Sequence, residues 1–327
     1  MRVKLNGLKL SAISAALPNK KLKMENLYER FGQREVERIA LSTGISSLRI
    51  AEEGVNASDL CLAATKHLLE MTGLSNKTID AIIFVSQTPD YKMPATSCVL
   101  QGKLELNTSA VAFDINYGCS GYIYGLYQAA LLISSKSASR VLVCVGDTIS
   151  RFLDPNDHKV RLVLGDAGSV SIVESGSDEW AFDINTDGSG FDKLIIPREN
   201  HKDGYLQMDG SAIMEFALRE VGTSFDNVIN DRGWNKADIQ HAILHQPNEF
   251  MLNYLRKKIG LSHEQMPVVV KEYGNTGPAS IPLTMCDYYS NTAELGKAVM
   301  SGFGVGLSWG SIALNLCETK LYKPIFI

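Results

Sequence analysis

The sequence has little of what marks several large classes of protein. Its six cysteines are scattered at positions 61, 98, 119, 144, 286 and 317 and form no Cys-x-x-Cys pair, so we expect neither a disulfide framework nor a zinc site. No apolar run approaches the roughly 18 residues that span a bilayer. The formal net charge of −4 leaves no basic excess for nucleic acid. These absences predict a reduced, cytoplasmic protein that binds neither a membrane nor nucleic acid.

Apolar and helical segments alternate along the 327 residues, enough chain for one large domain or two fused halves. Continuous apolar runs of strand length are followed by longer segments with helical periodicity. This alternation predicts an α/β fold whose sheets are covered on both faces. The predicted buried strands are 81–86, 111–115, 141–146, 239–244 and a short one at Val268–Val270, and the longest predicted helix is 212–232. A polar, glycine-rich stretch at 174–191 marks the seam between two halves.

Cys119 stands at the centre of the most informative stretch, Val111–Leu132. A strand-like VAFDI is followed by a glycine-bearing turn, and Cys119 then heads a segment that is apolar nearly all round, as in a helix buried in the core. Unpaired N–H groups and the dipole at a helix N-terminus favour negative charge, so this position predicts a thiolate nucleophile. A buried structural cysteine is the alternative reading.

Three polar residues, Cys119, His245 and Asn275, each follow a predicted strand in a glycine- or proline-bearing turn. The carboxyl ends of strands gather functional groups in α/β sheets, so we expect these turns to converge. An amide is no base near neutral pH, which leaves two readings. One is a cysteine hydrolase with His as base, and the other is an acyl-transfer enzyme in which His and Asn hold a thioester oxygen. The remaining histidines, at 67, 158, 201, 241 and 263, lack ligand spacing, so no metal is expected.

Four motifs in order resemble those of the β-ketoacyl-acyl carrier protein synthase III family. Asp114–Gly121 (DINYGCSG) resembles its nucleophile motif, and Leu244–Asn248 (LHQPN) its histidine motif, with proline where a small residue is usual. Gly274–Thr276 matches its asparagine motif, and Gly302–Ser311 (GFGVGLSWGS) its C-terminal glycine-rich signature. The likeness covers nearly the whole chain and indicates a divergent member of that family.

The resemblance implies a thiolase fold, with two similar halves stacked as αβαβα layers and usually a homodimer. Residues 1–174 would form the half with the nucleophile, and residues 175–327 the half with His245 and Asn275. No cofactor is implied, because the substrates arrive as thioesters of acyl carrier protein or coenzyme A.

By the same resemblance, Cys119 would accept an acyl group, and His245 and Asn275 would hydrogen-bond the thioester carbonyl of a malonyl-type extender during loss of CO₂ and condensation. Backbone N–H groups of Cys119 and Val305 would form the oxyanion hole. Further residues implied to line the substrate pocket are Phe303, Asn248 and, contributed to the partner subunit, Met93.

Departures from the family pattern affect the expected acyl donor. The tryptophan and arginine that commonly clamp the adenine of coenzyme A are Arg38 and Ser42 here, a further arginine is His158, and a carrier-docking arginine is Phe250. We therefore expect a donor carried on a carrier protein, with a weak docking candidate in the basic run Arg256, Lys257 and Lys258. Transfer to an alcohol or amine, thioester hydrolysis and a non-catalytic partner subunit stay open, as do acyl chain length and pathway.

Overall fold

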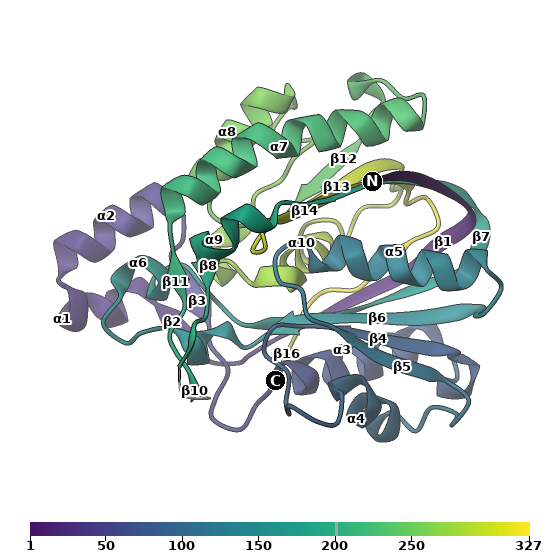
Figure 1. The fold of residues 1–327 in the computed structure, drawn as a ribbon, viewed down its shortest axis with the longest axis horizontal. Helices are drawn as coiled ribbons and strands as arrows, with labels where there is room; N and C mark the ends of the chain where they lie inside the picture. The colour runs from purple at the N-terminus through teal and green to yellow at the C-terminus, as the bar shows by residue number, and fades with distance from the viewer. Residues whose placement is uncertain (200–201) are drawn as a thin grey trace.

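In this computed structural model, residues 1–199 and 202–327 are described, and His201 lies outside them. The chain forms five alternating layers of helix and sheet, as Figure 1 shows, which confirms the predicted thiolase architecture. From one outer face to the other, the layers are α7 (Gly210–Asp231) and α8 (Glu249–Ile259); β12 (His241–Leu244), β13 (Lys297–Gly304) and β14 (Ser308–Asn315); α5 (Gly121–Ser134) and α10 (Ser280–Tyr288); β6 (Arg140–Asp147), β4 (Ala81–Val85) and β5 (Val111–Ile115); and α3 (Ala57–Thr72) and α4 (Thr96–Lys103).

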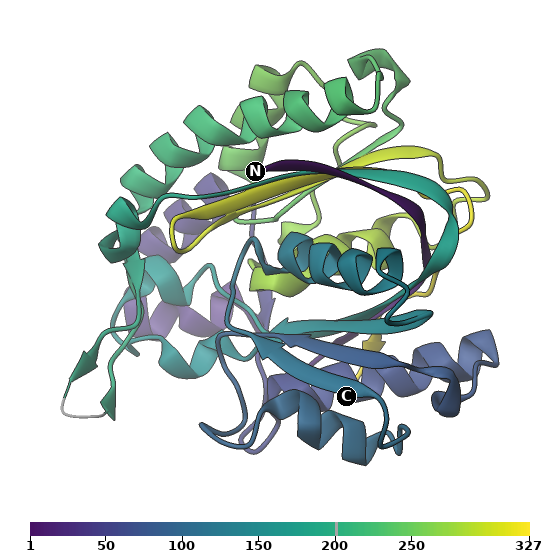
Figure 2. The same cartoon turned by 45° about the vertical axis from the view of Figure 1, so that its right-hand side comes forward.

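Two long strands, β1 (Arg2–Leu17) and β7 (Ala167–Thr186), belong to both sheet layers. They pair antiparallel along their length and curve together from one layer to the other, as Figure 2 shows. The strand order is β12-β13-β14-β7-β6-β4-β5, with β1 against β7. The pairing is irregular where Leu8 lies opposite both Ser175 and Asp178. The boundary predicted after residue 174 therefore falls inside β7, at its exposed bend.

The central strands are apolar on both faces because each sheet is covered on both sides. In β4, Ile83 packs into the core around the middle helices, whereas its neighbour Phe84 packs into a second core with α3. In β6, Val143 and Cys144 divide in the same way. Full burial of such side chains is worth about 1.5–3 kcal/mol each, so both faces contribute to stability and the strands read as unbroken apolar runs.

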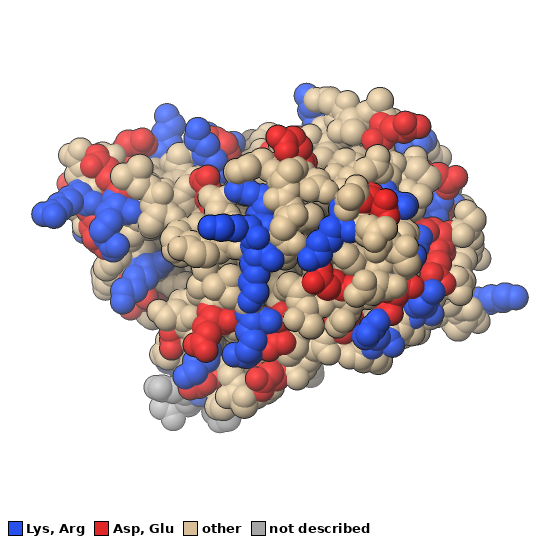
Figure 3. Space-filling view, turned by 90° about the horizontal axis from the view of Figure 1, so that it is seen from above, with Lys and Arg blue, Asp and Glu red and all other residues tan. Residues whose placement is uncertain are grey.

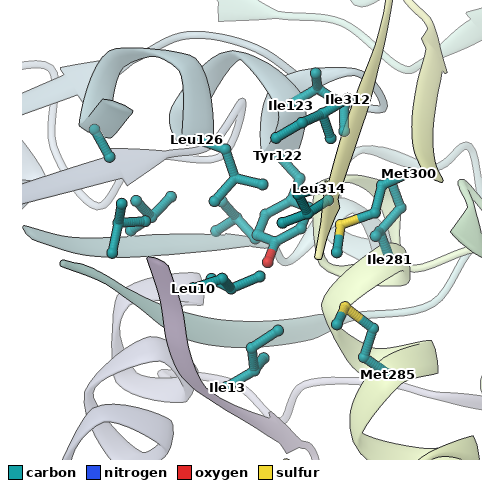
Figure 4. Packing of buried hydrophobic residues seen from close by; sticks show 14 of the residues in the cluster. Leu10, Ile13, Tyr122, Ile123, Leu126, Ile281, Met285, Met300, Ile312 and Leu314 are labelled. Atoms are coloured by element: carbon teal, nitrogen blue, oxygen red, sulfur yellow. The ribbon is translucent and has the colours of Figure 1, made fainter. Parts of the chain in front are cut away.

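Helix α5 lies in the middle of the molecule, between the two sheet layers. Figure 4 shows Tyr122, Ile123 and Leu126 of this helix packed among side chains of α10, β13 and β14. A Cβ atom on Gly125 would lie 2.9 Å from Val143 Cγ1, so glycine is needed for the helix to approach β6 this closely. Contact with both sheet layers explains why this segment is mostly apolar, although a stripe that includes Tyr124, Tyr127 and Leu131 stays partly exposed.

Two expectations about local structure are wrong, and one helix was not predicted. Val268–Val270 is no strand; residue 270 begins the short helix α9 (Val270–Tyr273), and the side chain of Gln246 accepts the Val269 N–H. The strand β5 is an edge strand whose residues are partly exposed. The polar stretch near residue 35 contains an unforeseen helix, α2 (Gln33–Thr43), whose buried face is narrow.

The remaining elements are short. They are β2 (Lys21–Lys23), α1 (Tyr28–Phe31), β3 (Ser47–Arg49), α6 (His158–Arg161), β8 (Leu194–Ile195), β9 (Arg198–Glu199), β10 (Lys202–Asp203), β11 (Gln207–Met208), the 3₁₀ turn η6 (Gly277–Ala279), β15 (Lys320–Leu321) and β16 (Ile325–Phe326), with further 3₁₀ turns between them. Within the described ranges, no helix combines the length and the apolar character needed to cross a membrane.

Candidate active site

Cys119 lies in the turn between the end of β5 and the start of α5 and is partly buried. The end of β13 packs directly against it. A Cβ atom on Gly304 would lie 2.8 Å from both Cβ and Sγ of Cys119, and Gly304 has φ +153°. Glycine at this position therefore leaves room for the cysteine side chain and for a group bonded to its sulfur.

Burial and backbone hydrogen bonds have opposite effects on the pKa of the Cys119 thiol. Backbone N–H groups of Val305 and of Cys119 itself are directed to the sulfur and lower the thiol pKa, but burial outweighs them and raises it to about 11. The expectation of a thiolate at a helix N-terminus is therefore wrong for the resting protein. Desolvation disfavours the anion more than two N–H groups favour it.

His245 follows the last residue of β12 and is 2% exposed. Its backbone N–H donates to the carbonyl of Ser301 in the neighbouring strand, over 2.8 Å. Its ring meets Phe303 edge-on, with centroids 5.5 Å apart. Burial lowers the ring pKa from 6.5 to about 3, so the imidazole is neutral at physiological pH.

The hydrogen bonds of Ser280 favour one tautomer of His245. Ser280 Oγ lies 2.7 Å from His245 Nδ1 and also accepts the backbone N–H of Gln246, over 3.3 Å. If its own proton goes to Nδ1, every buried partner is satisfied. Nδ1 is then the acceptor and Nε2 carries the ring proton. The backbone of Gly277 lies against the ring and raises its pKa, which offsets part of the effect of burial. His245 is thus a neutral donor.

Asn275 is held on both sides of its backbone. Its N–H donates to Val163 over 2.8 Å, and its carbonyl accepts from Gly165 over 2.9 Å. The side-chain Oδ1 accepts the N–H of Gly277, over 3.0 Å. Because the oxygen is used in this way, the NH₂ group is the part of the amide that can donate to a ligand.

Contacts between the three turns bring Cys119, His245 and Asn275 to one region. Gly277 bonds both the His245 ring and the Asn275 side chain. The following Pro278 packs against the head of α5, where its Cβ would lie 3.6 Å from a Cβ on Gly121, two residues after Cys119. The carboxyl ends of β5 and β12 therefore meet around the end of β13.

The electrostatics bear on the two readings that the sequence left open. Burial raises the pKa of the Cys119 thiol and lowers that of the His245 ring, and both shifts oppose transfer of a proton from Cys119 to His245. A resting thiolate–imidazolium pair, which a cysteine hydrolase uses, is therefore strongly disfavoured. The arrangement instead presents donors for an oxygen that becomes negative: two backbone N–H groups at the sulfur, an imidazole N–H and an amide NH₂.

The other predicted pocket residues occupy different environments. Phe303 is buried and borders His245, so it belongs both to the site and to the core. Asn248 caps α8, where its Oδ1 accepts the N–H of Met251 over 2.8 Å. Met93 lies on a surface loop and is 78% exposed, so it does not line the site of its own chain.

The basic run proposed for carrier docking does not form one surface. Arg256 is buried and donates to Asn253, Lys258 Nζ donates to the carbonyl of Leu218, and only Lys257 is exposed without such a contact among the described residues. Figure 3 shows acidic and basic side chains interspersed over the face formed by α7 and α8. Helical periodicity places adjacent residues on different faces, which sequence proximity concealed.

Asp147, a residue that the sequence did not single out, is also part of the site. It ends β6 and is buried, and its Oδ1 accepts four hydrogen bonds, from Ser86 Oγ, Gln87 N–H and both the N–H and hydroxyl of Thr88. Burial raises its pKa to about 6, and its negative charge raises that of Cys119. A single carboxylate at a strand end gave no signal in the sequence.

Comparisons with known proteins identify relatives along most of the chain. The family described as 3-oxoacyl-(acyl-carrier-protein) synthase III matches residues 113–188, and its C-terminal domain matches residues 229–316. The chain is similar to the β-ketoacyl-(acyl-carrier-protein) synthase III of Geobacillus kaustophilus, with 33% identity over 94% of this chain and 99% of that protein. It is also similar to that of Bacillus pumilus, with 34% identity over 88% and 92%.

A solved structure adds the same evidence in three dimensions. The 3-oxoacyl-(acyl-carrier-protein) synthase of Burkholderia xenovorans superposes with a TM-score of 0.97 and 36% sequence identity, covering 100% of this chain and 99% of that one. Sequence identity above 30% over nearly the full length, together with the shared fold, shows the family of the protein. The chain belongs to the 3-oxoacyl-(acyl-carrier-protein) synthase III family.

Proposed function

We propose that this protein is a decarboxylating condensing enzyme that forms an acyl-enzyme on Cys119 and joins its acyl group to a malonyl-type thioester. The observation that carries the proposal is the set of neutral donors around a partly accessible thiol. The N–H groups of Val305 and Cys119 point to the sulfur, while His245 and Asn275 present a second pair.

In the first half-reaction, the sulfur of Cys119 attacks the carbonyl carbon of an acyl thioester. The carbonyl oxygen becomes negative and is held by the two backbone N–H groups. The bond to the carrier sulfur then breaks, and the proton of Cys119 leaves with the carrier thiol. Each preorganised donor of this kind is typically worth about 3–4 kcal/mol in the transition state.

In the second half-reaction, a malonyl thioester places its carbonyl oxygen between His245 and Asn275. Its carboxylate leaves as CO₂, and the electron pair of the broken bond passes into an enolate stabilised by those donors. The enolate carbon attacks the acyl group, the bond to the Cys119 sulfur breaks, and the released thiolate takes up a proton from water to restore the thiol. A neutral imidazole with its proton on Nε2 suits this role, because it donates throughout and need not change its charge.

The alternative functions receive less support. A hydrolase needs a base that activates the nucleophile, and the low pKa of His245 makes it a poor one. A non-catalytic subunit has no need to keep Cys119 partly accessible beside two pairs of donors. Transfer to an alcohol or amine would use the same acyl-enzyme and differs only in the second substrate.

We infer that the primer is delivered by a carrier protein. Arg38 donates two hydrogen bonds to Glu35, and His158 lies 3.1 Å from the same carboxylate. Ser42 donates to the carbonyl of Ile39. These three positions correspond to those where the family resemblance places the coenzyme A clamp, and their polar groups are occupied within the protein. Efficient turnover of micromolar acetyl-coenzyme A, compared with acyl carrier thioesters, would contradict this inference.

We also propose that the enzyme is a homodimer paired through β5. This edge strand leaves one side of its backbone unpaired in the sheet, and Val111, at its start, is 53% exposed. Tyr91 and Met93, on the nearby loop after β4, are 56% and 78% exposed. Light scattering after size exclusion gives the mass in solution, and substitution of Ala112 by proline in β5 should yield monomers.

The central experiment is incubation with a labelled acyl thioester, followed by mass spectrometry of the Cys119 peptide. We expect the acyl mass on that peptide and its absence in Cys119→Ala. Released CO₂ is then measured with malonyl carrier protein, and His245→Ala and Asn275→Ala should each reduce it. Free acid without extender would support hydrolysis instead, and acyl-enzyme without CO₂ release would support transfer to another acceptor.

A further inference from the structure

Two buried serines connect the nucleophile turn to the loop that supplies the Val305 N–H. Ser120 follows Cys119, and Ser308 begins β14. Their hydroxyl oxygens are 2.6 Å apart, and Ser308 Oγ is 2.7 Å from the carbonyl oxygen of Val305. Both residues are at most 1% exposed. The segments joined in this way are 188 residues apart in the sequence.

The direction of these hydrogen bonds follows from the inventory of donors. The carbonyl of Val305 can only accept, so the single proton of Ser308 is used there. Ser308 must then accept from Ser120, whose proton points across to β14. The chain of bonds therefore runs from Ser120 to Ser308 and on to the Val305 carbonyl, and successive bonds of this kind polarise and strengthen each other.

Backbone bonds hold the loop close to Val305, where Leu307 exchanges hydrogen bonds with Asp187 over 2.8 and 2.9 Å, whereas the Val305 carbonyl is bonded by a side chain. Val305, Gly306 and Leu307 form the connection between β13 and β14, and Gly304 pairs with Ser308 at its base. Gly306 has φ +138°, and a Cβ there would lie 2.9–3.2 Å from atoms of Ser308. The loop thus folds back on Ser308. Among the described residues, the side chain of Ser308 is the only one that bonds the Val305 carbonyl.

We propose that Ser308, supported by Ser120, is a positioning residue that holds the Val305 backbone so that its N–H faces the sulfur of Cys119. The carbonyl and the N–H of Val305 lie in different peptide units, and fixing the carbonyl restricts the torsions of the residue between them. The role in acyl transfer rests on the proposed function, whereas the placement of the N–H against the thiol does not.

The test compares two half-reactions and one reaction that needs no substrate. In Ser308→Ala, acyl-enzyme formation should slow about 10- to 100-fold, less than or comparable to the loss of an oxyanion donor. The rate of malonyl decarboxylation, which uses His245 and Asn275, should change less than about threefold. We set this limit because Ser308 does not hold those two donors. The pH midpoint for alkylation of Cys119 by iodoacetamide should rise, because a displaced N–H stabilises the thiolate less.

Further variants separate positioning from general destabilisation. Ser308→Thr keeps the hydroxyl and should restore acylation, and Ser120→Ala should give a smaller loss than Ser308→Ala because the bond to Val305 remains. The matched control is Ser311→Ala. Ser311 lies on the same strand and is equally buried, and its hydroxyl is 2.7 Å from that of Ser301, at a site away from the loop. It should leave the alkylation midpoint and the ratio of the half-reactions unchanged.

Different outcomes would refute the positioning role of Ser308 and the proposed function of the protein. Equal slowing of both half-reactions in Ser308→Ala, or an unchanged alkylation midpoint, would refute the positioning role. If Ser308→Ala does not fold, the same comparison on Ser120→Ala decides the question by the same criteria. A wild type that neither acylates nor decarboxylates would refute the proposed function, while the alkylation profile would still report on Val305.

Discussion

The clearest quantitative consequence of the structure concerns acid stability and His245. Its ring has a pKa of about 3 in the folded protein and 6.5 in an unfolded chain. Below pH 6.5 the unfolded state therefore binds a proton that the folded state refuses, and stability falls as the pH is lowered. Between pH 7.5 and pH 5 this single group should remove about 2 kcal/mol from the free energy of unfolding.

The perturbation that isolates this term is His245→Gln, which removes the titration while keeping a polar side chain of similar length. Urea unfolding midpoints of wild type and variant are measured at pH 7.5, 6, 5 and 4. The wild type should lose about 2 kcal/mol more than the variant between pH 7.5 and pH 5, and the contributions of all other groups cancel in this difference. The difference should continue to grow toward pH 4, because that pH still lies above the folded pKa.

A parallel pH dependence in both proteins would refute the reasoning, since it would mean that the His245 ring accepts a proton in the folded state near its ordinary pKa. That result would also restore the imidazolium as a partner for the Cys119 thiol and reopen the hydrolase reading. Burial also lowers the pKa of His241. The pH dependence of unfolding should therefore be weaker in His241→Gln than in the wild type, as it is in His245→Gln.

Three further predictions concern the neighbourhood of the thiol and the basic run. Gly304→Ala should abolish acylation of Cys119, because the added methyl occupies the space beside the sulfur, and should lower stability by about 1–3 kcal/mol; acylation at the wild-type rate by mass spectrometry would contradict the close approach. Asp147→Asn should move the alkylation midpoint of Cys119 to lower pH, because it removes a negative charge that raises the thiol pKa; an upward shift would exclude that electrostatic effect. Arg256→Ala should lower the free energy of unfolding in urea by about 1–3 kcal/mol, whereas Lys257→Ala should change it by less than about 0.5 kcal/mol. Equal effects of the two substitutions would mean that Arg256 is not buried in solution.

Most of the fold could be predicted because each central element has a local signature. The runs at 81–86 and 141–146 became β4 and β6, and the apolar stretch after Cys119 became α5. Val268–Val270 was misread because a buried apolar triplet has the same letters in a strand and in a short helical turn. Here the side chain of Gln246, more than 20 residues away, takes the place of a sheet partner.

Three members of the candidate site were predictable, but Asp147 and the electrostatics of the site were not. Motif order picked out Cys119, His245 and Asn275, whereas Ser280 and Ser308 required coordinates. Ser280 favours one tautomer of His245 through a bond across 35 residues. The basic run at 256–258 divides between interior and surface, because successive residues on a helix point in different directions.

The amino-acid sequence by itself determined the layered α/β architecture, the family and the three side chains placed after strand ends, because periodicity and short motifs are properties of neighbouring residues. Only the tertiary structure decided that the Cys119 thiol is protonated, that the His245 ring is neutral and that Ser308 bonds both Ser120 and the Val305 carbonyl. Desolvation and hydrogen-bond direction depend on atoms brought in from segments far apart in the chain, and no local pattern of residues encodes which of them will meet.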